Sequence, residues 1–251
     1  MAVQSRTVQT RVELRTEDGT LDLHLFHPDG AGPWPAVIFY MDAFGIRREL
    51  CAMADRLASH GYVVALPNLY YRSGEYPPFD PQQVAAGGAE RDRFKAMIAS
   101  IGHEAVRRDT AAIMASLEAN AAVRRGRMGV VGYCMGGGFA LAAAGTFPEA
   151  VAVAASLHGG SLATEKLDSP HRLADRIRAK VYVGVAELDP SFADDQRQRL
   201  EQALQAAGVD YQLEVYPGAR HGFAVTGHLV YDQAASERHW ATLVQLFAHT
   251  L

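Results

Sequence analysis

A cysteine between glycines is the residue in this chain whose setting best suits covalent chemistry. The segment GYCMG (132–136) follows an apolar run over 127–133 and precedes a helical pattern over 135–146. Its spacing is that of the G-x-S-x-G nucleophile elbow, with cysteine in the serine position. A tight strand-to-helix turn lifts such a side chain from the sheet, and the helix N-terminus favours a thiolate there. The pattern therefore predicts that Cys134 is a nucleophile.

The glycines around this cysteine have a predicted steric role. A side chain at Gly132 or Gly136 would collide with the neighbouring strand and helix, whereas Gly137 and Gly138 would let the helix pack close to the sheet. Glycine clusters also occur in purely structural turns. The interpretation as an elbow therefore depends on the strand–turn–helix context.

An acid and a histidine follow in the order that this kind of site requires. The buried pattern VYVGVAEL ends at Asp189, and His221 stands just beyond the alternating segment 211–217. His221 would take the proton from Cys134 and return it to the leaving group, while Asp189 would hold the imidazole tautomer. Taken singly, Asp189 could be a turn residue or helix cap, and His221 one histidine among ten. The competing acids are Glu187, Asp194 and Asp195.

The other cysteine, Cys51, has a different setting. It lies in a helical pattern over 47–60 that ends at Gly61, and it spaces with Ala54 and Ala58. We expect a buried, unreactive thiol that forms no disulfide, since neither cysteine has a CxxC or other metal-binding spacing.

The elements that must position these residues alternate between strand and helix. Short apolar runs predict buried strands, and the alternating segments 20–26 and 211–217 predict an antiparallel strand and a strand nearer the sheet edge. The buried runs are 35–40, 62–67, 127–133, 150–157 and 179–186. The further helical patterns are 104–119, 194–207 and 231–249. This alternation predicts the α/β class, with a mostly parallel sheet and helices on both faces.

The stretch 68–103 is the least regular part of the chain. Prolines at 77, 78 and 81 predict that no regular structure forms there. Because it leaves the carboxyl end of a buried strand, where ligands bind in such sheets, a lid over the site is favoured over a simple surface loop.

Composition limits the class of function. Hydrophobic residues make up 49% and charged residues 21%, and the net charge of −4 has no basic cluster, so nucleic acid is not an expected partner. The first 19 residues contain no apolar core of a secretion signal and no run is long enough to span a membrane, so we expect a cytoplasmic location. No H-E-x-x-H or similar spacing occurs, so neither metal nor other cofactor is expected.

The elbow GYCMGG, with Asp189 and the sequence HGF that begins at His221, resembles the dienelactone hydrolase family, also called carboxymethylenebutenolidases. The resemblance extends through DAFGI (42–46) and HGYVVALPNLYYR (60–72) to most of the chain. It implies one α/β-hydrolase domain over 1–251 and a Cys-His-Asp triad that opens unsaturated lactones. It also implies an oxyanion hole formed by the backbone N–H groups of Met135 and Ala43.

The resemblance also implies roles for residues outside the triad and the oxyanion hole. Asp42 stands where the family has a glutamate that tunes the nucleophile, and the alternative is a solvated aspartate in a turn. Tyr70 matches a family tyrosine near the site. Members of the family also bind a substrate carboxylate through arginines. One of these arginines lies four residues after the catalytic histidine, where this chain has Val225. A second arginine would correspond to Arg91 or Arg93, unless these belong to an ordinary charged helix face.

Hydrolysis of an ester or lactone is therefore the predicted activity, on a small-molecule substrate, by a monomer or small homo-oligomer. The absence of arginine at Val225 leaves a broader carboxylesterase or thioesterase for neutral acyl substrates as an alternative. A non-catalytic member of the fold that binds a ligand in its pocket is a second alternative, although a binding protein has no use for acid and base together.

Overall fold

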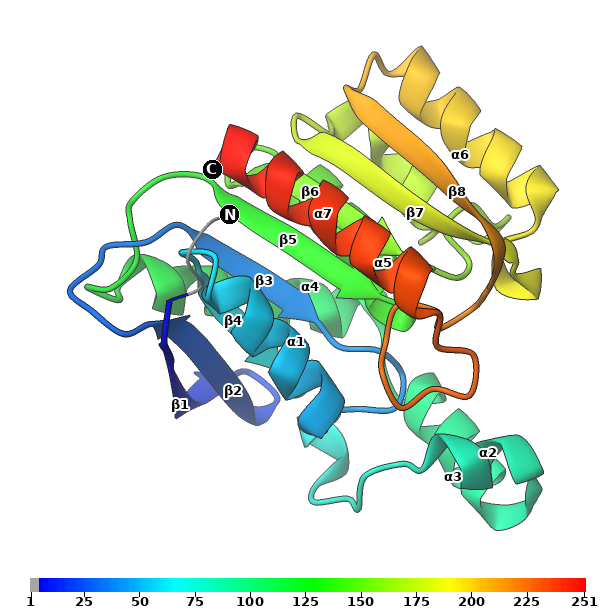
Figure 1. Cartoon of the computed structure of the whole chain (residues 1–251), viewed down its shortest axis with the longest axis horizontal. Helices are drawn as coiled ribbons and strands as arrows, with labels where there is room; N and C mark the ends of the chain where they lie inside the picture. The colour runs from blue at the N-terminus through cyan, green and yellow to red at the C-terminus, as the bar shows by residue number, and fades with distance from the viewer. Residues whose placement is uncertain (1–4) are drawn as a thin grey trace. The chain divides into compact units, whose positions relative to one another are not determined.

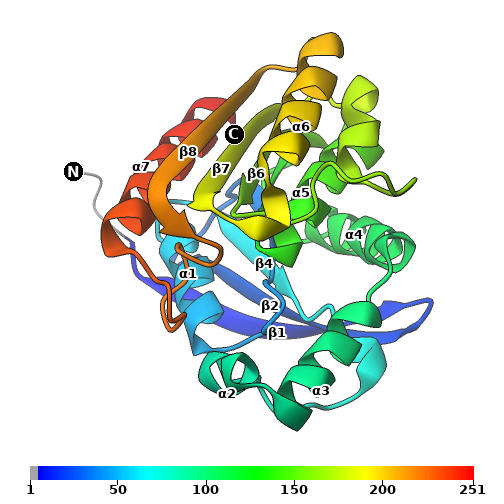
Figure 2. The ribbon, with the colours of Figure 1, turned by 90° about the vertical axis from the view of Figure 1, so that its right-hand side faces the viewer.

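The computed structural model describes residues 5–251; residues 1–4, the start of the N-terminal stretch considered above, lie outside the described residues. The chain forms two compact units, Met1–Gly126 and Arg127–Leu251. Both units contain strands covered by helices (Figures 1 and 2).

The first unit is a mixed sheet with a helix on each face. Its strands lie in the order β1-β2-β4-β3, and only β3 and β4 pair in parallel. The strands are β1 (Thr7–Thr16), β2 (Gly19–Pro28), β3 (Ala36–Tyr40) and β4 (Val63–Pro67). The helices are α1 (Arg48–Ala58), α2 (Pro81–Ala86), α3 (Gly88–Ala99) and α4 (His103–Glu118). Figure 2 shows α1 and α4 on opposite sides of these strands.

The second unit is a parallel sheet in the order β5-β6-β7-β8. Its strands are β5 (Met128–Tyr133), β6 (Val151–Leu157), β7 (Lys180–Leu188) and β8 (Tyr211–Arg220). Its helices are α5 (Met135–Thr146), α6 (Asp194–Ala206) and α7 (Gln233–Thr250). In Figures 1 and 2, α7 covers one face of these strands, and α5 and α6 cover the other. The prediction of a mostly parallel sheet with helices on both faces is confirmed.

The sequence patterns predict these strands because a strand covered by helices on both faces consists of apolar residues. Every residue of β3, β4, β5 and β6 is buried, as expected for strands covered on both faces. The alternating segment 211–217 forms part of β8, which is the last strand in the order and is less buried than β7. Its predicted edge position is therefore correct.

One prediction for a less regular segment is wrong, and one strand was not predicted. The prediction that no regular structure forms in the stretch 68–103 is wrong, since it contains α2 and α3. Pro81 is compatible with α2 because it occupies the first helical position, where the missing N–H costs nothing. Asp80 caps this helix by accepting a hydrogen bond of 2.8 Å from the Gln82 N–H. The sequence also failed to predict β1, whose side chains are all at least partly exposed. Its half-buried Val8, Val12 and Leu14 alternate with polar residues, and this pattern could have indicated the strand.

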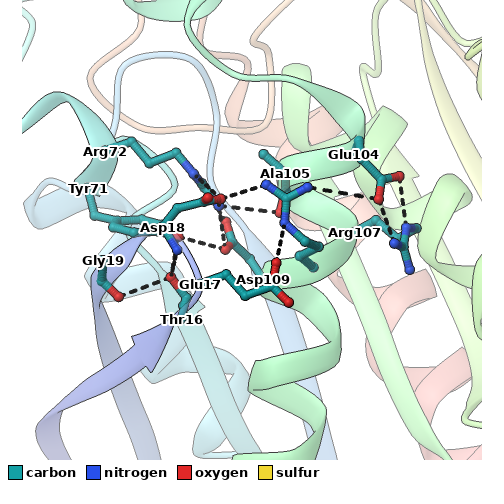
Figure 3. Close-up of polar contacts among 11 residues, drawn as sticks. Thr16, Glu17, Asp18, Gly19, Tyr71, Arg72, Glu104, Ala105, Arg107 and Asp109 are labelled. Carbon is teal, nitrogen blue, oxygen red and sulfur yellow. Dashed lines mark hydrogen bonds and ion pairs between the residues drawn. The ribbon is translucent and has the colours of Figure 1, made fainter.

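The start of the stretch 68–103 is held in place by the buried carboxylate of Asp109. The Arg72 guanidinium donates to both carboxylate oxygens of Asp109 at 2.8 Å, and the Tyr71 hydroxyl donates to the same carboxylate at 2.8 Å (Figure 3). Asp109 is fully buried on α4, while Asp18, in the turn between β1 and β2, accepts from Arg72 and from Arg108. These contacts join the turn after β4 to α4 and to the first hairpin.

Candidate active site

Cys134 occupies a strained turn between β5 and α5. Its φ of 55° and ψ of −119° lie in a region that side-chain-bearing residues rarely adopt. A Cβ at Gly132 would lie 1.9 Å from the carbonyl oxygen of Gly136, so the strand can approach the helix only without a side chain there. This geometry is that expected for a nucleophile elbow.

The two glycines that follow differ in their packing. A Cβ at Gly137 would lie 2.4 Å from Ser156 Oγ and 2.9 Å from Gly159 Cα, so the close approach predicted for Gly137 is correct. At Gly138 the nearest atoms would be at 3.7 and 3.9 Å, which are ordinary contacts. The prediction that Gly138 is also needed for close packing is therefore wrong.

The second unit brings Cys134, His221 and Asp189 into one chain of hydrogen bonds. His221 Nε2 lies 3.0 Å from Cys134 Sγ, and His221 Nδ1 lies 2.6 Å from Asp189 Oδ2. The carboxylate is fully buried, whereas 28% of the His221 side chain is exposed. The geometry suits transfer of the thiol proton to an imidazole whose other nitrogen is held by a carboxylate.

Strand ends position all three groups. Cys134 follows β5, Asp189 follows β7 and His221 follows β8, and these strands belong to one parallel sheet. The carboxyl ends of parallel strands meet at one edge, which is why residues so far apart in the sequence come together.

The electrostatics of the site favour a protonated His221 beside an ionised Asp189. Burial lowers the pKa of His221, but the Cys134 sulfur and the Asp189 carboxylate outweigh this and raise it to about 11. Burial raises the pKa of Asp189, and hydrogen bonds from His221 and Ser191 more than compensate, so that pKa is lowered. Both effects favour an imidazolium held between the sulfur and the carboxylate.

Protonation of His221 can be measured directly. Because the Cys134 sulfur raises the pKa of His221 by charge and by hydrogen bonding, we expect Cys134→Ala to lower that pKa. In wild type, ring ¹⁵N shifts followed by NMR should show both His221 nitrogens protonated at pH 8. In Cys134→Ala the second proton should be lost at a lower pH, and in the control Cys51→Ala it should not. An identical titration in Cys134→Ala would contradict the assignment.

Sequence reasoning missed two residues beside this chain of hydrogen bonds. The Ser191 hydroxyl donates to Asp189 Oδ1 at 2.6 Å and lies 3.0 Å from His221 Nδ1. His158 Nδ1 accepts a hydrogen bond of 3.2 Å from the Cys134 backbone N–H, and its ring centroid lies 5.3 Å from that of His221. His158 directly follows β6, so the rule that selected Asp189 and His221 could have found it.

The residues expected to form an oxyanion hole lie in different units. Met135 is the first residue of α5, where backbone N–H groups have no partner within the helix. Ala43 belongs to the first unit, and its carbonyl accepts a hydrogen bond of 2.7 Å from the Tyr70 hydroxyl. This contact places Tyr70 beside Ala43, although the function of all three residues stays a prediction.

Asp42 is fully buried, so the alternative of a solvated aspartate in a turn is wrong. Arg47 donates to its two carboxylate oxygens at 2.6 and 2.7 Å, and the Phe44 N–H donates to one of them at 3.0 Å. No pattern in the sequence indicates this ion pair. It fixes the loop that contains Ala43.

The two arginines considered for substrate binding both contact other residues of the stretch 68–103. Arg91 donates to the carbonyl of Val84 at 3.0 Å and to that of Ala85, near the end of α2. Arg93 pairs with Glu90 at 2.6 Å and lies 3.9 Å from the Phe79 ring centroid. A substrate role for either arginine remains a prediction.

Val225 is fully buried in the turn after His221. An arginine placed there would need repacking of its surroundings and a partner for its charge. No helix among the residues that the structure describes is long and apolar enough to cross a membrane.

Comparison with known proteins agrees with the resemblance. The model of the Dienelactone hydrolase family matches residues 21–251. A Synechocystis protein named "Putative carboxymethylenebutenolidase" is 27% identical, over 98% of this chain and 98% of its own length. A Bradyrhizobium protein named "Probable 2-oxo-3-(5-oxofuran-2-ylidene)propanoate lactonase" is also 27% identical, over 95% of this chain and 93% of its own.

A solved structure shows the same fold. The structure named "Putative Dienelactone Hydrolase" from Klebsiella pneumoniae has a TM-score of 0.84 at 24% identity, covering 96% of this chain and 98% of that one. This likeness confirms the fold class predicted from the sequence. Since the family model matches nearly the whole chain, this protein belongs to the dienelactone hydrolase family and is a hydrolase.

Proposed function

We propose that the protein hydrolyses a lactone or ester through a covalent thioester on Cys134, with His221 as base and acid and Asp189 as the group that orients it. The observation that supports this most is the continuous chain of contacts at 3.0 Å and 2.6 Å from sulfur to imidazole to carboxylate. Its order along the sequence is also that of the elbow-bearing hydrolases.

The proposed reaction has two steps, which form and then hydrolyse the thioester. The Cys134 thiolate attacks the carbonyl carbon, and His221, which holds the thiol proton, returns it to the leaving oxygen. His221 then takes a proton from the water that attacks the thioester, which releases the acid and restores the Cys134 thiolate beside a protonated His221. Asp189 stays ionised and keeps Nδ1–H directed toward itself through both steps. The backbone N–H groups of Met135 and Ala43 are the proposed donors to the oxyanion.

A lactone is the preferred substrate class because the Bradyrhizobium relative is named as a lactonase. Buried Val225 favours neutral substrates as a second candidate, since it replaces the arginine expected to bind a substrate carboxylate. A charged hydrogen bond contributes about 1.5–3 kcal/mol, which corresponds to about ten- to a hundredfold in kcat/KM.

A panel of substrates tests activity and specificity together. We expect purified protein to hydrolyse neutral esters and lactones at least as well as carboxylate-bearing ones. The comparison is kcat/KM for a carboxylate-bearing lactone and for its methyl ester. A tenfold preference for the free acid would show that another cation binds the substrate carboxylate. The cation nearest to His221 in the sequence is the exposed Arg220. No turnover of any substrate would favour the non-catalytic alternative.

Thiol labelling tests the nucleophile without a substrate. Cys51 is partly rather than fully buried, in contrast to the prediction, but burial still raises its pKa and so lowers its thiolate fraction. We therefore expect iodoacetamide at neutral pH to label Cys134 first, as measured by peptide mass mapping over time. Cys51 is the internal control. Equal or faster labelling of Cys51 in the native protein would contradict the assignment.

A further inference from the structure

Ser191 makes contacts with both partners of the Asp189–His221 pair. Its hydroxyl donates to Asp189 Oδ1 at 2.6 Å, and its backbone N–H donates to the same oxygen at 2.9 Å. The other carboxylate oxygen, Oδ2, faces His221 Nδ1 at 2.6 Å. Both ends of the carboxylate are therefore fixed, one by the histidine and one by the serine.

The hydroxyl also has a second partner. Because Ser191 Oγ gives its hydrogen to Asp189, it can act only as an acceptor toward His221 Nδ1, which lies 3.0 Å away. The Nδ1–H group thus faces two acceptors, the carboxylate and the serine oxygen. This arrangement becomes more favourable when His221 is an imidazolium, since its ring N–H groups are then stronger donors.

The surrounding backbone holds Ser191 in place. It lies in the short 3₁₀ turn Pro190–Phe192 that Asp189 caps. The Ser161 N–H donates to the Ser191 carbonyl at 2.8 Å, and a Cβ at Gly160 would lie 2.8 Å from Ser191 Oγ and 3.7 Å from His221 Cε1. A glycine is thus needed where the loop after β6 passes over the serine and the histidine.

A simple turn would not need this hydroxyl. The backbone N–H of Ser191 already satisfies Asp189 Oδ1 as a helix cap does, and alanine at 191 would keep that bond. The side chain adds only the link to Asp189 and His221. We propose that Ser191 is a positioning residue that acts through Asp189, extending the proposed triad to Cys134–His221–Asp189–Ser191. This inference rests on the proposed function.

The expected effect of Ser191→Ala follows from the loss of one charged hydrogen bond. We expect kcat for p-nitrophenyl acetate to fall about tenfold, with KM changed less than twofold, because the proposed role of the serine is to position Asp189 and His221 and not to bind substrate. Ser191→Thr keeps the hydroxyl and should restore most of the rate. The matched control is Ser169→Ala, which removes the hydroxyl of a buried, hydrogen-bonded serine from the same unit and should leave kcat unchanged.

The pH profile separates positioning from simple support of the fold. Within the second unit, the titratable groups facing His221 are Cys134, Asp189 and His158. Without Ser191, the carboxylate loses a donor, so its pKa rises, and the imidazolium loses an acceptor, so its pKa falls. The pH–rate curve of Ser191→Ala should therefore be narrower than that of wild type on both limbs, while that of Ser169→Ala should not.

A double-mutant cycle decides whether Ser191 acts through Asp189. In Asp189→Asn, further replacement of Ser191 by alanine should change kcat less than twofold. A full tenfold loss in that background would overturn the inference, as would wild-type kcat and pH profile in Ser191→Ala. If Ser191→Thr does not fold, as judged by its melting temperature, the alanine variant and the cycle still decide. Full activity of Asp189→Asn would instead overturn the proposed function itself.

Discussion

Cys134→Ala is expected to lose ester hydrolysis by about 10⁴-fold or more, because it removes the atom that forms the covalent intermediate. His221→Ala should lose a similar factor, since His221 Nε2, 3.0 Å from the sulfur, is the proposed acceptor of its proton. The double variant should be little worse than either single one, because residues that act in one step are strongly non-additive. The measurement is kcat/KM for each variant, with the melting temperature as a check of folding.

Asp189→Asn should retain more activity than these variants, about a few per cent or less of wild type, because neutral histidine still transfers a proton from a poorer tautomer. Cys51→Ala is the control for loss of a thiol and should match wild type. If His221→Ala kept most of the activity with its fold intact, the proposed base would be wrong. If the two single losses multiplied in the double variant, the residues would not act together.

Gly132→Ala is expected to be the most destabilising of the small substitutions in the elbow. The added Cβ would lie 1.9 Å from the Gly136 carbonyl oxygen and 2.8 Å from the Gly137 nitrogen, and both are backbone atoms that cannot rotate away. We expect the free energy of unfolding to fall by about 3 kcal/mol or more, since the strand and helix would have to separate. Urea denaturation followed by circular dichroism measures this loss.

Gly138→Ala is the matched control, six residues further along in the same strand–turn–helix segment. Its Cβ would meet only ordinary contacts at 3.7 and 3.9 Å, and alanine favours a helix more than glycine does. We therefore expect its stability to be unchanged or slightly increased. Equal destabilisation by the two substitutions would mean that the elbow is not held by close backbone contact at Gly132.

Most helices and strands could be predicted because their signals are local. The run 127–133 became β5, and the pattern over 135–146 coincides with α5. Pro81 was interpreted as a helix breaker although it begins α2, because proline excludes helix interiors but not first turns. The strand β1 was missed because it has no continuous apolar run and because polar Thr10 interrupts the alternation of Val8, Val12 and Leu14.

The sequence by itself determined the elbow and the order of Cys134, Asp189 and His221, because glycine spacing and strand ends are properties of short segments. Only the tertiary structure decided that Ser191 contacts Asp189 and His221, and that Arg47 pairs with Asp42. Serine and arginine occur in many turns, and their spacing carries no signal of which atom they face. That choice depends on side-chain direction and on how loops pack after the strands have aligned, which no local pattern encodes.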